Sequence, residues 1–126
     1  VQTCALPIWL EPVLEFHRPM RREERRSLAL HEAIADALDR DPEGVRLQAK
    51  QSLELMESVA PTSQAVREWG VLLDRSVQSL REVLLDRSPW ARELRHVTPF
   101  AGVLTARERT MAMKRFTASE RERDEA

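Results

Sequence analysis

Three histidines, His17, His31 and His96, are the side chains in this sequence best suited to catalysis or metal binding. The run HEAIA, which begins at His31, resembles the start of a zinc-protease helix, where two histidines four residues apart bind the metal. Ala35 stands where the second histidine is needed, so the motif is incomplete. We interpret His31 as a histidine on a helix face. His96 follows Arg95 near a predicted helix end, where a cation favours the helix dipole.

The other residue patterns do not predict an enzyme either. Gly44, Gly70 and Gly102 are isolated in the sequence and form no phosphate-binding glycine loop. Cys4 is the single cysteine, so neither a disulfide framework nor a thiolate metal site is expected. Aspartate and glutamate alternate with arginine, which is typical of solvated helix faces. We therefore expect no catalytic residue, no metal and no cofactor.

The first residues of the chain are expected to contribute nothing to the fold. VQTCALPI, residues 1–8, resembles an in-frame translation of a sequencing adaptor, and such scars are excluded from fold reasoning. Met20 opens MRREERR and reads as a start codon. We expect residues 1–19 to be an artefact or a translated upstream segment.

Composition favours one small helical domain. The chain has 126 residues, 33% of them charged, and three glycines, which suits exposed helices better than sheets. It carries 20 Lys and Arg against 21 Asp and Glu, a balance that argues against wholesale nucleic-acid binding but leaves a local patch open. No apolar run approaches the roughly 20 residues of a membrane span. With no signal peptide visible, a cytoplasmic protein is expected.

Prolines and capping residues divide the chain into helices. The spacing predicts helices over 22–40 and, after Asp41-Pro42, to about residue 58. Thr62 or Ser63 is expected to cap a third helix. Two LLDRS runs each end a short helix, and the serine of each run is expected to be the N-cap of the next helix. Thr105 and Glu108 form a capping box that starts the last helix, in which Met111 and Met113, or Phe116, face inward. The residues expected to face the core in the first three helices are Leu28, His31, Ile34, Ala35, Leu38, Val45, Ala49, Leu53, Met56, Val66, Trp69 and Leu73. We predict an all-α domain of five to six short helices over residues 20–116, followed by a flexible charged tail over 117–126.

The segment from Val97 to Ala106 carries no charge at all in an otherwise charge-dense chain. Gly102 suits a tight turn with positive φ between two helices. The apolar side chains of this segment must pack either on the domain's own core or on another protein. The candidate partner-binding residues are Pro99, Phe100, Gly102, Val103 and Leu104.

A cluster of arginines leaves nucleic-acid binding open as an alternative. Arg21, Arg22, Arg25 and Arg26 fall within about two helical turns, and residues 34–53 faintly resemble a helix-turn-helix. The expected turn holds acids that repel phosphate, so we interpret these arginines as part of a solvated face. A small DNA-binding regulator remains the second hypothesis.

Two blocks of sequence resemble a known group of proteins. RRSLALHEAIADAL and ARELRHVTPFAGVLTARER are similar to small bacterial proteins encoded directly before a nucleotidyltransferase-like protein, in an arrangement like a type II toxin–antitoxin pair. The spacing of Trp69 and Leu73 also fits, whereas His96-Val97-Thr98 departs from the Gln-x-Ser of the group. The resemblance implies a non-enzymatic, antitoxin-like protein whose partner is the nucleotidyltransferase-like protein. A structural domain without such a partner is a third possibility.

Overall fold

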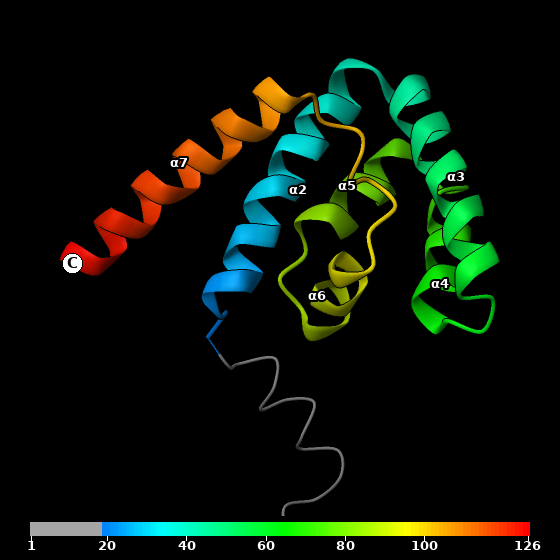
Figure 1. Ribbon diagram of the computed structural model, residues 1–126, viewed down its shortest axis with the longest axis horizontal. Helices are drawn as coiled ribbons and strands as arrows, with labels where there is room; N and C mark the ends of the chain where they lie inside the picture. The colour runs from blue at the N-terminus through cyan, green and yellow to red at the C-terminus, as the bar shows by residue number, and fades with distance from the viewer. Residues whose placement is uncertain (1–18) are drawn as a thin grey trace, which may run out of the picture.

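The computed structural model describes residues 19–126, and that part of the chain forms six α-helices and no strand (Figure 1). The all-α bundle predicted from the sequence is confirmed. His17, the adaptor-like residues 1–8 and most of the proposed upstream segment lie outside the described residues. The helices are α2 (Arg22–Arg40), α3 (Pro42–Val59), α4 (Gln64–Leu72), α5 (Val77–Leu85), α6 (Pro89–His96) and α7 (Ala106–Glu125).

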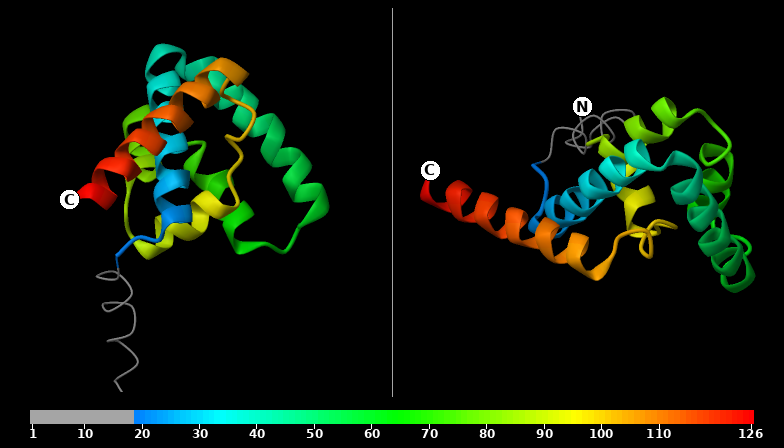
Figure 2. Two further views of the ribbon diagram at one scale, coloured as in Figure 1. Left: turned by 60° about the vertical axis from the view of Figure 1, so that its left-hand side comes forward. Right: turned by 90° about the horizontal axis from the view of Figure 1, so that it is seen from above.

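Helix α2 lies at the centre of the bundle, with α3, α5, α6 and α7 all in contact with it (Figure 2). It packs against several helices because its buried side chains occupy more than one of its faces. Leu28, Ile34 and Leu38 follow the predicted helical spacing, and Ala33 and Ala37 are buried beside them. Small alanine side chains let a neighbouring helix approach closely, so α2 is covered on several sides.

The core is built around two aromatic rings. The Trp69 and Phe100 rings meet edge to face, with their centroids 5.5 Å apart, and neither side chain is exposed. The Trp69 Nε1–H also donates to the carbonyl of Leu94 at 2.9 Å, so its polar atom is satisfied inside the core. This geometry joins α4, α6 and the connection between α6 and α7.

Short polar residues start the helices as the sequence predicts. The side chains of Ser63, Ser76 and Ser88 accept hydrogen bonds from the first turns of α4, α5 and α6. Asp41 alone separates α2 from α3, and its carboxylate accepts from the Gly44 N–H at 3.1 Å. A single residue between two helices forces a sharp change of direction there.

Helix α7 begins at the predicted capping box and runs antiparallel to α2 (Figure 1). Its start is fixed by the Thr105 hydroxyl and the Glu108 carboxylate, which accept from each other's backbone N–H. The helix continues to Glu125, through residues that the sequence analysis assigns to a flexible tail. A contact that the sequence cannot reveal supports the continuation, because Glu120 forms an ion pair with Arg25 of α2 at 2.8 Å.

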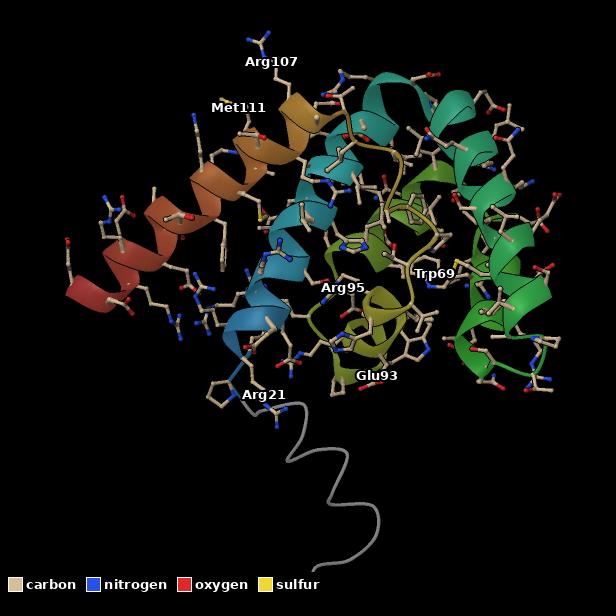
Figure 3. The ribbon with its side chains drawn as sticks, viewed as in Figure 1. Arg21, Trp69, Glu93, Arg95, Arg107 and Met111 are labelled. Atoms are coloured by element: carbon tan, nitrogen blue, oxygen red, sulfur yellow. The ribbon has the colours of Figure 1, made fainter. Side chains whose placement is uncertain are left out.

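Of the two predicted inward faces of α7, the one with Phe116 is buried, and the one with Met111 and Met113 is not. Ala112 and Phe116 are buried, whereas Met113 is half-buried. Met111 is 48% exposed and points away from α2 (Figure 3). The spacing of Ala112 and Phe116, one helical turn apart, places both against α2.

Candidate protein-docking surface

The uncharged segment after α6 turns its large apolar side chains into the core. Pro99 and Phe100 are fully buried, and Leu104 is 8% exposed. Val103 is half-buried against the same core, and Gly102 is exposed. The sequence leaves open whether these apolar side chains pack on the domain's own core or on another protein. In the structure the large ones pack on the domain's own core.

Gly102 does not adopt the positive φ that the sequence analysis expects, since no described glycine has a positive φ. A Cβ built on Gly102 lies 3.6 Å from the Gln48 Nε2, an ordinary van der Waals distance. The turn is held instead by hydrogen bonds to its carbonyls. Gln48 of α3 donates to the Gly102 carbonyl and Arg109 of α7 donates to the Ala101 carbonyl.

His31 anchors the beginning of this segment to α2. Its Nδ1 lies 2.7 Å from the Ser27 carbonyl, which can only accept, so Nδ1 carries the proton. Nε2 is then an acceptor and receives the Thr98 hydroxyl at 3.0 Å. The Thr98 oxygen in turn accepts from the Phe100 N–H at 3.2 Å. This chain of three hydrogen bonds fixes the entry of Phe100 into the core, and it assigns His31 a structural role.

The protonation of His31 is strongly perturbed by its surroundings. Its pKa is lowered from 6.5 to about 4, mainly because burial disfavours the charged imidazole. The hydrogen bond to the Ser27 carbonyl raises the pKa, and the nearby Arg95 guanidinium lowers it further. The imidazole is therefore neutral near pH 7, as its acceptor role at Nε2 requires.

Arg95 is a buried cation that the sequence analysis does not single out for burial. It is 3% exposed, and its Nη1 donates to the carbonyls of Val83, Leu84 and Asp86 at the end of α5. Carbonyls at a helix C-terminus have no donor within the helix. The Val83 carbonyl also accepts from the Asp86 N–H, so Arg95 is a second donor there and donates in addition to the Leu84 and Asp86 carbonyls. Burial lowers the pKa of Arg95. Figure 3 places this side chain inside the bundle.

The arginine cluster at the start of α2 is partly used inside the domain. Arg22 lies over the Phe116 ring, 5.1 Å from its centroid, and Arg25 pairs with Glu120 at 2.8 Å. Arg21, Arg22 and Arg26 are exposed. Because Arg25 is held in an ion pair and Arg22 lies over an aromatic ring, only part of the cluster is free.

Helix α3, which would be the recognition helix of a helix-turn-helix, is not basic either. Its exposed residues include Glu43, Glu54 and Glu57, and Lys50 pairs with Asp74 at 3.0 Å. Carboxylates on that surface would repel a phosphate backbone.

One side of α3 meets the uncharged segment at two places, Val97 and Gly102. Leu55, Val59 and Val97 are 72%, 85% and 36% exposed and border one shallow pocket of about 340 Å³. Along the same side of α3, the Gln48 side chain reaches the turn at Gly102. We call this the uncharged surface and define it by Gln48, Leu55, Val59, Val97, Ala101 and Gly102. Of the predicted partner-binding residues, Gly102 lies on it, Val103 is half-buried against the core, and Pro99, Phe100 and Leu104 are buried.

Other kinds of site find little support between residues 19 and 126. No three side chains among histidine, cysteine, aspartate and glutamate lie close enough there to hold a metal ion. None of the six helices is long and apolar enough to cross a membrane. His96 is exposed in the last turn of α6, where the sequence analysis expects a cation.

In comparisons with known proteins, the chain matches no protein-family model, no curated protein and no solved structure.

Proposed function

We propose that this protein is a non-enzymatic interaction module, antitoxin-like in kind, whose partner is a nucleotidyltransferase-like protein encoded beside it. The partner's identity comes from the sequence resemblance in the two blocks around His31 and Phe100. The proposed docking site is the uncharged surface.

The observation that carries the proposal is the exposure of aliphatic side chains on a charge-rich protein. One third of the residues are charged, yet no charged residue lines the pocket between α3 and Val97, which is bordered by Leu55, Met56, Val59, Ala60, Val66 and Val97. Leu55 and Val59 expose most of their side chains there. Exposed aliphatic side chains gathered around one apolar pocket are typical of sites of protein association.

The supporting segment gives this surface a fixed shape. Phe100 in the core and the Thr98–His31 hydrogen bond tether the backbone between Val97 and Gly102 to the domain at two points. A preorganised surface loses less conformational entropy when a partner binds.

Co-expression with the adjacent gene product, followed by size-exclusion chromatography, tests the proposal. We expect one co-eluting complex at micromolar concentration. Two separate peaks would contradict the proposed function.

Substitutions test the position of the docking site. Val59→Asp is expected to weaken association by at least about tenfold, because it places a charge in an apolar contact. Val71→Asp is the matched control, since Val71 is also exposed, at 59%, but lies on α4 and does not line the pocket around Leu55, Val59 and Val97. Equal losses in both variants would refute this assignment of the docking site.

A further inference from the structure

A groove of about 440 Å³ lies between α2 and α7, on elements that the uncharged surface does not use. Leu28, Ala29 and Ala33 line it from α2, and Ala112 and Phe116 line it from α7. Three of these five residues are alanines, whose small side chains allow a further helix backbone to come close. Ala29 is half-buried and the other four are buried, so the groove has a narrow apolar floor between two antiparallel helices.

The two sides of the groove carry charges of opposite sign. Glu32 and Asp36 border it from α2, whereas Arg115 and Arg123 border it from α7, and all four are exposed. Arg87, from the connection between α5 and α6, adds a third exposed cation.

These charged side chains are not consumed by ion pairs inside the domain. Arg25 and Glu120, which also line the groove, pair with each other at 2.8 Å. Among residues 19–126, the ion pairs include none formed by Glu32, Asp36 or Arg115. The charges that border the groove are thus available to a ligand.

We propose that this groove binds an amphipathic α-helix of another protein. From Arg25 to Asp36 the groove extends over about 16 Å of α2, which matches about three helical turns. A ligand helix would place a seam of small aliphatic side chains on the alanine floor. Its flank toward α7 would carry carboxylates for Arg115 and Arg123, and its flank toward α2 would carry cations for Glu32 and Asp36. The inference does not depend on the proposed function, because it concerns a second surface.

Two synthetic, fluorescein-labelled peptides of about 15 residues serve as probes. Both share one Leu/Ala seam. The split-flank peptide has glutamates on one flank and lysines on the other, and the all-lysine peptide has lysines on both. In fluorescence anisotropy titrations we expect the split-flank peptide to bind the full chain about tenfold more tightly. The variant Arg115→Glu/Arg123→Glu, in which both sides of the groove are acidic, should reverse this preference. Failure of both peptides to bind, or the same preference in both proteins, would overturn the proposal.

Two tryptophan substitutions locate the bound peptide. Ser119 is exposed and lines the groove, so Ser119→Trp should fill it and abolish binding. Thr117 is exposed on the opposite side of α7, and Thr117→Trp should leave binding unchanged. Loss of binding in both variants would place the peptide elsewhere and contradict the inference.

Two further measurements distinguish a foreign helix in the groove from self-association and from docking at the uncharged surface. A protein that sediments as a dimer, and becomes monomeric with Ser119→Trp, would assign the groove to a second copy of the chain and overturn the proposal. Peptide binding should be unchanged by Val59→Asp. This variant therefore separates a failure of the groove proposal from a failure of docking at the uncharged surface.

Discussion

Replacing His31 by glutamine should flatten the dependence of stability on pH. In the folded protein the imidazole is 2% exposed and neutral, and its Nε2 accepts the Thr98 hydroxyl. Protonation would remove that acceptor and place a charge in a buried site near the Arg95 guanidinium. Glutamine has a donor and an acceptor but does not titrate.

The size of the effect follows from the two pKa values. His31 takes up a proton near pH 6.5 in the unfolded chain but only near pH 4 in the folded chain. Between these values the unfolded state binds more protons, so acid favours unfolding. One pKa unit corresponds to about 1.4 kcal/mol. The contribution of neutral His31 is complete above pH 6.5, and about 3 kcal/mol of stability is lost as the pH falls to about 4.

Urea unfolding at several values between pH 7.5 and 4, for the wild type and His31→Gln, measures this directly. The wild type should lose about 3 kcal/mol more than the variant over this range. The pKa of Glu108 is lowered because its carboxylate accepts from Thr105, so Glu108 contributes its own acid sensitivity in both proteins and cancels in the comparison. His96→Gln is the matched control, because His96 is exposed. Parallel pH profiles for the wild type and His31→Gln would refute the reasoning.

Three further predictions concern buried or turn positions, and a fourth concerns a helix cap. Phe100→Ala should lower the free energy of unfolding by about 3–5 kcal/mol in thermal melts, because it empties a fully buried site beside Trp69. Gly102→Ala should change stability by less than about 0.5 kcal/mol, since its φ is not positive and a Cβ there makes no clash; a large loss would contradict this geometry. Trp69→Phe should cost about 1–3 kcal/mol, because the buried hydrogen bond from Trp69 Nε1 to the Leu94 carbonyl is lost and the smaller ring leaves space in the core. Thr105→Ala should cost about 1 kcal/mol and reduce helicity in circular dichroism, and unchanged helicity would exclude its capping role.

The helices could be predicted because their ends are determined locally. Ser63, Ser76 and Ser88 cap the first turns of their own helices, and these bonds span three residues. The end of α7 was harder to predict, because Glu120 is held by Arg25, 95 residues earlier in the chain. A run of charged residues at the end of a chain is typical of a flexible tail, and the sequence does not show that Arg25 forms an ion pair with Glu120.

The site could be predicted only in part, for the same reason. The absence of charge between Val97 and Ala106 is visible in the sequence, but the direction of Phe100 depends on Trp69 and on the Thr98–His31 bond. Leu55 and Val59 belong to the uncharged surface because the fold places them beside Val97, around one pocket. Arg95 is buried against carbonyls that carry no sequence signal, since every residue has one.

The attachment of α7 to a single main neighbour gives the domain two levels of protection against hydrogen exchange. Contacts of α7 are concentrated on α2, whereas α2 also supports α3, α5 and α6. We therefore expect the amides of α7 to exchange through a local opening that breaks one interface, and those of α2 to require a more global unfolding. A ligand helix in the groove would contact α2 and α7 together, and it would slow the exchange of α7 first.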